Sequence, residues 1–112
     1  MKHKDRLTSA TEFRRVRRTG KSYAHPLVLL IASSSGDSSG GQSRYGVSAS
    51  RAIGGAVRRN RAKRRMRTAF QQFELGSGWD LILVARPGLN DASWSDLLCA
   101  VGDLLKKAGV TG

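Results

Sequence analysis

Residues 45–73, YGVSASRAIGGAVRRNRAKRRMRTAFQQF, decide the fold, because an alternating segment runs through two glycines into a strongly basic helical segment. Over residues 45–50 apolar side chains alternate with small ones, which is typical of a strand with one packed face. From Ala56 to Phe73 there is no Pro or Gly, and the apolar residues recur at helical spacing. They are Ala62, Met66, Ala69, Phe70 and Phe73. We therefore expect a strand, a tight turn and an amphipathic helix.

The centre of this helix, residues 58–67 (RRNRAKRRMR), carries seven Arg or Lys residues, and no acid occurs between Gly40 and Phe73. One helical face is polar, and Arg59 is expected at its seam with the apolar stripe. The face consists of Asn60, Lys63, Arg64 and Arg67, flanked by Arg61 and Arg65. A solvated basic face is the simplest alternative. Arg outnumbers Lys six to one, however, and Arg matches phosphate with a planar fork, so the run indicates a polyanion partner.

The whole chain has 112 residues, a length that predicts a single domain over residues 1–112. Its net charge of +12 makes nucleic acid the leading class of partner. Residues 1–70 hold 17 of the 20 Lys and Arg, so the C-terminal part is expected to be scaffold. Cys99 is the only cysteine, which excludes an internal disulfide and fits a reducing, cytoplasmic compartment. No apolar run has the length of a membrane span or follows the pattern of a signal core, so no membrane partner is expected.

The N-terminal region begins with a basic segment, residues 1–7, that we expect to be a flexible tail. Ser9 and Glu12 then form a capping-box pattern, which predicts a helix to about Arg18 that stops at Gly20. Phe13 has two readings in this helix. It is either a core anchor or an exposed platform on which a base stacks.

Two strands are predicted in the middle of the chain. Residues 27–32 (LVLLIA) form a continuous apolar run, which predicts a central strand covered on both faces. Residues 33–43 are rich in Ser and Gly and predict a flexible hairpin loop leading into residues 45–50. In that second strand Ser48 and Ser50 belong to the small polar face, which is either an open groove or a solvated sheet surface.

The turn over residues 53–55 contains Gly54 and Gly55, and its exposed N–H groups could hold a phosphate, although no P-loop pattern is present. We expect the basic helix to end at Gly76 and Gly78.

The C-terminal part predicts a strand over residues 79–85 (WDLILVA) and a helix capped by Ser93 and Asp96. The apolar stripe of this helix is typical of a packing helix. It consists of Trp94, Leu97, Leu98, Val101, Leu104, Leu105 and Ala108. Trp94 and Cys99 are therefore interpreted as structural residues.

Residues for catalysis are few. The two His, at 3 and 25, have no carboxylate at a meaningful spacing, and HExxH, GxSxG and a cluster of carboxylates for Mg²⁺ are all lacking. The chain alone does not read as an enzyme. It reads as an RNA- or DNA-binding α+β domain.

Residues 45–70 resemble the protein subunit of bacterial ribonuclease P. The family pattern is a Gly–hydrophobic–Ser strand, a Gly-containing turn and a helix with an RNR motif. Its counterparts are Gly46-Val47-Ser48, Ile53-Gly54, Arg59-Asn60-Arg61, Lys63-Arg64 and Arg67. Arg6-Leu7, the run from Glu12 to Val16, Gly20 and the strand near residues 80–86 also match, so the resemblance covers roughly residues 6–108.

The resemblance implies a fold and an activity. The fold is an α+β, α-β-β(-β)-α-β-α two-layer sandwich like the second domain of ribosomal protein S5, with a left-handed βαβ crossover. The implied function is that of a ribonuclease P subunit, which binds the catalytic RNA and the 5′ leader of precursor tRNA. The holoenzyme is an endoribonuclease, a hydrolase whose RNA removes the leader. The RNA would bind most of the Mg²⁺, and the protein, with no catalytic residue of its own, would need no obligate protein partner.

The resemblance also implies a role for particular residues. Arg58, Arg59, Asn60, Arg61, Lys63, Arg64 and Arg67 would contact the catalytic RNA. Phe13, Arg17, Ser48 and Ser50 would line the leader cleft. The family often has a second aromatic one helical turn after Phe13, where this chain has Arg17, so guanidinium stacking would replace ring stacking there.

Three other classes of protein share some of these features. A ribosomal or assembly protein has the same charge and mixed α/β form, and sedimentation with ribosomes would reveal it. A double-stranded DNA binder would need a second helix just upstream of the basic one, which the sequence does not predict. A stand-alone nuclease would need an acid or metal constellation that is not found.

Overall fold

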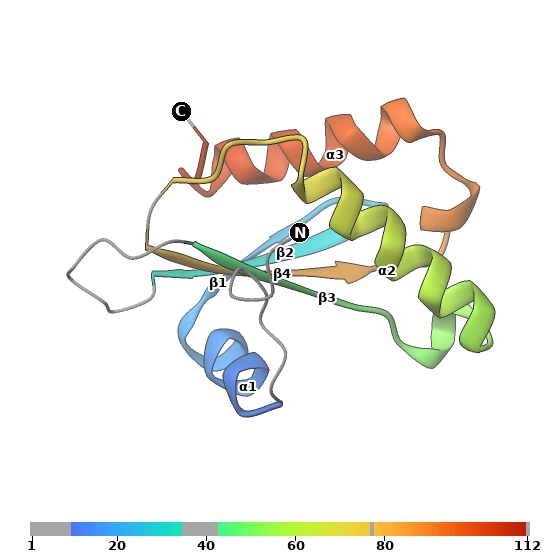
Figure 1. Ribbon diagram of the computed structural model, residues 1–112, viewed down its shortest axis with the longest axis horizontal. Helices are drawn as coiled ribbons and strands as arrows, with labels where there is room; N and C mark the ends of the chain where they lie inside the picture. The colour runs from blue at the N-terminus through green and yellow to red at the C-terminus, as the bar shows by residue number, and fades with distance from the viewer. Residues whose placement is uncertain (1–9, 35–42, 77, 112) are drawn as a thin grey trace.

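The computed structural model describes residues 10–34, 43–76 and 78–111, and these form a four-stranded sheet with helices on both faces (Figure 1). The main elements are α1 (Ala10–Thr19), β1 (Lys21–Ala24), β2 (Val28–Ser34), β3 (Arg44–Ser48), α2 (Ala56–Phe70), β4 (Trp79–Ala85) and α3 (Trp94–Lys107). Two short 3-10 helices, η2 (Arg51–Ile53) and η3 (Leu89–Asp91), precede α2 and α3. The mixed α+β class and the order of elements are confirmed.

The last strand of the chain, β4, lies inside the sheet, whose order is β1-β2-β4-β3. β4 is antiparallel to β2 and parallel to β3, and Leu83 pairs with Leu30 on one side and with Val47 on the other. The predicted hairpin loop over residues 33–43 is therefore wrong, because β4 separates the two strands that the loop connects. Its ends, Ser33 and Ser43, are buried, and residues 35–42 lie outside the described part.

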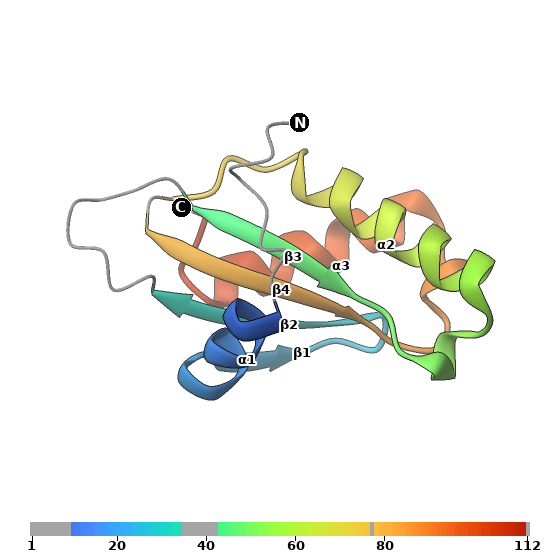
Figure 2. The same cartoon turned by 60° about the horizontal axis from the view of Figure 1, so that its bottom comes forward.

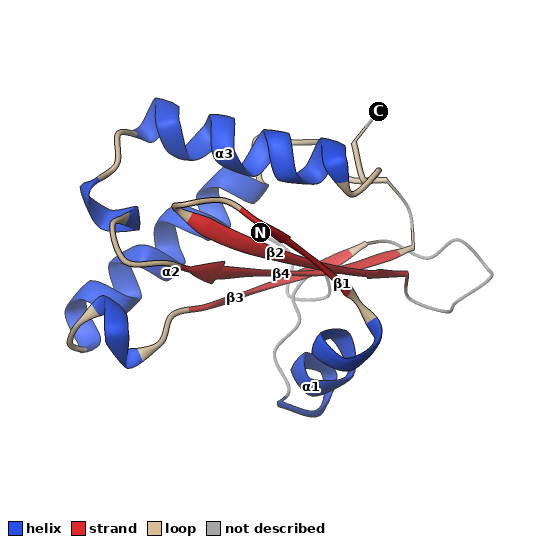
Figure 3. Cartoon of the chain, turned by 180° about the vertical axis from the view of Figure 1, so that it is seen from behind, coloured by secondary structure: helices blue, strands red, loops and turns tan. Residues whose placement is uncertain are grey.

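One face of the sheet is covered by α2 and α3 (Figure 3). The predicted stripe of α2 is confirmed, and the ring of Phe70 lies against that of Tyr45 with centroids 4.7 Å apart. The buried residues of α3 are Leu97, Ala100, Val101, Leu104 and Leu105. The Oγ of Ser93 accepts a hydrogen bond from the N–H of Asp96 at 3.0 Å, as the capping pattern predicts. This face holds the larger core.

Two details of this face differ from the expectation. α2 ends at Phe70 and not at Gly76, because the chain turns there and Phe73 leaves the helix to pack on α3. A Cβ atom on Gly102 would lie only 3.1 Å from the Phe73 ring, so the ring packs closely against α3 at this glycine. Trp94 and Cys99, both interpreted as structural residues, are exposed. Trp94 is 39% exposed, because it is the first residue of α3 and lies beyond the core, and Cys99 is not among the buried residues of the helix.

The other face of the sheet carries α1 (Figure 2). Its core is small, with Val16, Ile31 and Ile82 as the buried residues. The predicted central strand is thus covered on both faces, as β2. The two-layer description applies to the sheet with α2 and α3, and α1 adds a short third layer. The helix stops before Gly20 as predicted, whereas its expected cap, Ser9, and the tail at residues 1–7 lie outside the described part.

β1 is the strand that the residue pattern did not predict. Its four residues are mostly exposed, and it joins the sheet by antiparallel pairing with β2. It places α1 across the sheet, opposite the cores of α2 and α3.

Candidate nucleic-acid interface

A cleft of about 590 Å³ lies between α1 and the edge strand β3, and α2 closes one side of it. α1 contributes Ala10, Phe13, Arg14 and Arg17 to its lining, β3 and the residue after it contribute residues 45–49, and α2 contributes Lys63 and Arg67. Four of these side chains are cationic, and none is acidic. The cleft can therefore hold an extended anionic chain, with the cations along its sides and an aromatic ring at one wall.

The position of Phe13 is compatible with both readings of the sequence, and its stacking on a base stays a prediction. Phe13 is half-buried, packs against the small core of Val16, Ile31 and Ile82, and also lines the cleft. The same side chain therefore contacts the core of this face and borders the cleft. Arg17 lies in the same cleft, as the predicted replacement for a second aromatic requires.

The floor of the cleft is the small face of β3. Gly46 is buried and Ser48 is half-buried, so the floor is flat and near the backbone. The predicted open groove is therefore present at Ser48. Ser50 lies elsewhere. It is exposed beyond the strand, where its Oγ accepts a hydrogen bond from the N–H of Ala52 and caps η2.

The basic residues of α2 point in three directions, where the sequence suggested a single polar face. Lys63 and Arg67 turn toward the cleft. The outward side is exposed and carries Asn60, Arg61 and Arg64. Arg59 is half-buried at the seam, as predicted. The helix can therefore contact one strand in the cleft and a second nucleic-acid surface on its outer side.

The remaining basic residues of α2, Arg58 and Arg65, point toward the protein itself. Their internal contacts were not predicted from the sequence. The guanidinium of Arg65 donates to the carbonyl oxygens of Leu89 at 2.6 Å and Ala92 at 2.7 Å. Arg58 donates from Nε to the carbonyl of Ile53 at 3.2 Å, and Asn90 donates to the carbonyl of Arg58 at 3.0 Å. The contacts of Arg65 and Asn90 hold η3 and the residue after it against α2, and that of Arg58 holds η2, so Arg65 in particular serves the scaffold.

The turn before α2 brings the backbone close to Arg58. Gly54 has a φ of 133°, which favours glycine, and a Cβ at this position would lie 2.6 Å from the Arg58 side chain. Gly55 caps α2 without a side-chain hydrogen bond. The phosphate-binding role suggested for this turn stays a prediction.

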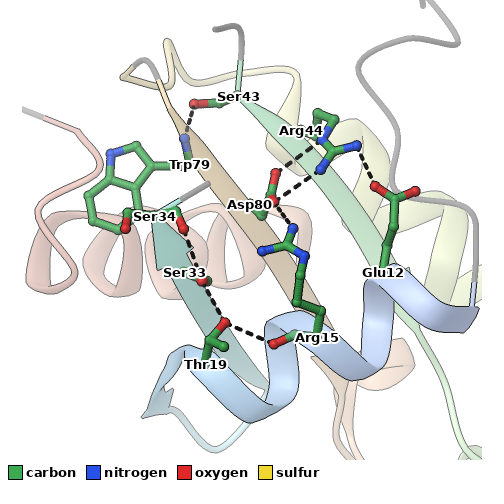
Figure 4. A network of polar contacts seen from close by, with 9 residues as sticks. All are labelled: Glu12, Arg15, Thr19, Ser33, Ser34, Ser43, Arg44, Trp79 and Asp80. Carbon is green, nitrogen blue, oxygen red and sulfur yellow. Dashed lines mark hydrogen bonds and ion pairs between the residues drawn. The ribbon is translucent and has the colours of Figure 1, made fainter. Parts of the chain in front are cut away.

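An ion network around the buried carboxylate of Asp80 ties α1 to the sheet below the cleft (Figure 4). Asp80 on β4 is fully buried and forms an ion pair with Arg15 of α1. Its two oxygens also accept hydrogen bonds from Nε and Nη2 of Arg44 on β3, both at 3.1 Å. Arg44 in turn pairs with Glu12. The hydrogen bonds to Asp80 raise the pKa of the Arg44 guanidinium above its ordinary value, so Arg44 stays charged.

The fold and this cleft define a class: a small, strongly basic α+β domain that presents a cation-lined groove beside an arginine-rich helix. A family model described as Ribonuclease P matches residues 1–109. The chain belongs to the ribonuclease P protein family.

Relatives in sequence agree with this assignment. The ribonuclease P protein component of Herpetosiphon aurantiacus is 36% identical over 110 residues, which cover 96% of this chain and 87% of the relative. The protein of the same description from Dehalococcoides mccartyi is also 36% identical, over 98% of this chain and 89% of the relative. Membership implies a general role in the processing of tRNA 5′ ends, as a component of an endoribonuclease.

Solved structures agree with the fold. The RNase P protein of Staphylococcus aureus superposes with a TM-score of 0.81 at 25% identity and covers 96% of this chain and 98% of its own. The RNase P protein from Thermotoga maritima gives a TM-score of 0.79 at 24% identity, over 91% of this chain and 96% of its own. Among the residues described here, no helix is long and apolar enough to cross a membrane.

Proposed function

We propose that this chain is the protein subunit of ribonuclease P, which binds the catalytic RNA and the 5′ leader of precursor tRNA and assists Mg²⁺-dependent removal of the leader. One observation carries the proposal. The same helix, α2, lines the cleft with Lys63 and Arg67 and exposes Asn60, Arg61 and Arg64 on its outer side. A single rigid element therefore joins a groove for one strand to a surface for another RNA.

The cleft is suited to the leader because it accepts a single strand without reading its sequence in detail. Phe13 offers a ring for stacking, and Arg14, Arg17, Lys63 and Arg67 can neutralise phosphates on either side. The floor at Gly46 and Ser48 lets the strand approach the backbone of β3. We expect these contacts to lower the dissociation constant of substrates that carry a leader.

The outer face of α2 is suited to the catalytic RNA. The exposed arginines can bind phosphates with planar, paired hydrogen bonds, and their mutual repulsion on the helix is relieved when phosphates lie between them. Arg59 at the seam is expected to contribute to this surface. Contacts on both sides of α2 would fix the leader relative to the catalytic RNA, which is how the protein would position the scissile bond.

Mg²⁺ is expected to be held mainly by the RNA. In the described part of the chain, no group of three or more His, Cys, Asp or Glu side chains converges on one point. The buried carboxylate, Asp80, is already paired with two arginines. We propose that the protein contributes no catalytic residue, works in the cytoplasm and has no obligate protein partner, the compartment being suggested by the free, exposed Cys99.

The experiment is cleavage of precursor tRNA by a bacterial ribonuclease P RNA at low Mg²⁺ and near-physiological salt, with and without the protein. We expect the protein alone to be inert and the RNA with protein to cleave at the mature 5′ end. When a cation of α2 is removed, as in Arg64→Ala, the matched control is Lys107→Ala, which removes an exposed cation at the last residue of α3. RNA binding without any gain in cleavage would contradict the proposal, and sedimentation with ribosomes would then test the alternative of a ribosomal protein.

A further inference from the structure

α1 forms one wall of the cleft, yet it is held to the sheet mainly by polar contacts. Five residues of α1 contact the sheet, and three of them are polar. They are Glu12, Phe13, Arg15, Val16 and Thr19. Only Val16 among them is fully buried. The orientation of α1 therefore depends on where its polar partners lie.

The two ends of α1 are held differently. At the C-terminal end a Cβ on Gly20 would lie 2.7 Å from the carbonyl oxygen of Val16 and 2.9 Å from that of Ala32, so backbone meets backbone there. Thr19 adds a hydrogen bond of 2.9 Å between its Oγ1 and the Oγ of Ser33. This end is fixed by close packing and by the chain itself, which continues into β1.

Toward the N-terminal end the attachment is ionic. Arg15 reaches the fully buried Asp80, and Glu12 reaches Arg44, which itself holds Asp80 through both oxygens. Figure 4 shows Arg15 and Arg44 converging on Asp80 from α1 and β3. α1 forms a wall of the cleft and β3 its floor, so one carboxylate links the wall to the floor.

We propose that Asp80 is a positioning residue, which sets the width of the cleft by fixing α1 against β3 through Arg15 and Arg44. Without this carboxylate, two arginines lose their shared partner and repel each other. α1 then pivots about Gly20, and Phe13 and Arg14 move relative to the floor at Ser48. The network holds two cations and two anions, so Arg15 and Arg44 belong to the internal structure and not to the phosphate-binding surface.

The first test measures the cleft in the free protein. Spin labels on Thr11→Cys and Arg51→Cys, both exposed sites, in a Cys99→Ser background report the distance between α1 and η2. Asp80→Asn is expected to broaden or lengthen the distance distribution. Thr19→Val is the matched control, because it removes a hydrogen bond from the end of α1 that close packing already fixes. A distribution for Asp80→Asn that equals the wild type would overturn the proposal.

The second test uses the reconstituted holoenzyme and rests on the proposed function. Substrates with a long leader and with a one-nucleotide leader are compared. Asp80→Asn is expected to weaken binding of the long-leader substrate roughly 3- to 30-fold, the range for residues that act on a site without touching its ligand. Binding of the one-nucleotide substrate and of the catalytic RNA should stay at the wild-type level. Equal leader preference in wild type and Asp80→Asn would overturn the positioning role.

Further variants separate positioning from folding. Arg15→Lys keeps a cation facing Asp80 and should retain most of the leader preference, whereas Arg15→Met should lose it. Should Asp80→Asn fail to fold, Glu12→Gln replaces it, since its ion pair with Arg44 is about one-third exposed (34% and 30%) and adds little to stability. If the wild-type holoenzyme itself shows no leader preference, the proposed function fails. The distances between the spin labels still decide whether Asp80 sets the width of the cleft.

Discussion

The two faces of the sheet are covered by helices that attach in opposite ways. α3 packs through five buried apolar residues in the larger core, and its outer side is ordinary scaffold. α1 buries only Val16 and depends on the ion pairs of Glu12 and Arg15 with Arg44 and Asp80. Apolar burial is non-directional and large, whereas an ion network is directional and fixes geometry.

This difference separates stability from function within one small domain. The face of α2 and α3 supplies most of the apolar burial that keeps the chain folded. The face of α1 contributes little burial and instead sets where Phe13, Arg14 and Arg17 stand relative to β3. Substitutions on the two faces should therefore be distinguishable by whether they change the free energy of unfolding or the affinity for a leader.

The largest effect is expected in the core of α3. Leu104→Ala removes a side chain that is 1% exposed and should lower the free energy of unfolding by about 2–5 kcal/mol. Val16→Ala on α1 should cost less, because its cluster has only three buried residues. Denaturant unfolding measures both, with the exposed Ser95→Ala as control. An equal cost for Leu104 and Val16 would remove the contrast between the faces.

Phe13→Ala tests whether the face of α1 acts in leader binding more than in stability. If the ring stacks on a base, affinity for long-leader substrate should fall by about 1–3 kcal/mol, while affinity for the catalytic RNA changes little. Titration of holoenzyme with long-leader and one-nucleotide-leader substrates measures this. A loss of stability with unchanged leader affinity would show that Phe13 acts only as a core anchor.

Neighbouring arginines on α2 give a matched pair. Arg65→Ala removes two hydrogen bonds to the carbonyls of Leu89 and Ala92 and should lower the free energy of unfolding by about 1–3 kcal/mol. Arg64→Ala changes an exposed side chain and should leave unfolding unchanged while weakening binding of the catalytic RNA. Denaturant melts and RNA titrations of the two variants are compared. Unfolding of the Arg64 variant would show that the helix is oriented differently.

The smallest effect is on the salt dependence of binding. If the basic surface neutralises about six phosphates, the logarithm of the RNA-binding constant should fall with the logarithm of salt at a slope of about −4 to −5. Arg64→Ala should reduce this slope by about 0.7, the contribution of one phosphate on a single strand. Arg65→Ala should leave the slope unchanged. Binding measured over a series of salt concentrations tests both.

Sequence reasoning succeeded where the signal was periodic. The strand at residues 79–85, the Ser93 cap and the buried stripe of α2 follow from spacing alone. The cleft at Phe13 and Ser48 followed from a small-residue face combined with the family resemblance. β1 was not predicted from the residue pattern, because its four mostly exposed residues carry no apolar pattern. Its position in the sheet depends on pairing with β2.

Other features depended on contacts distant in sequence. The Ser- and Gly-rich segment looked like a hairpin because strand order cannot be read from composition. The internal contacts of Arg58 and Arg65 were not predicted, since their acceptor carbonyls belong to other elements; Arg58 was assigned to the RNA-binding surface, and Arg65 was placed only at the flank of the polar face. The burial and pairing of Asp80 could have been predicted from the sequence. An acid inside the apolar strand WDLILVA must be paired if it is buried, so a search for cationic partners could have found the network.

The central position of β4 has a consequence for synthesis of the chain. During translation β1 and β2 can pair early, but β3 has no neighbour until residues 79–85 leave the ribosome, because β4 separates it from β2. Until then a strongly cationic fragment exposes the edges of β2 and β3 that β4 later pairs. Such edges favour aggregation. Completion of the sheet therefore waits for a strand that is made late, after β1, β2, β3 and α2, and a chain truncated before β4 cannot join β3 to β2.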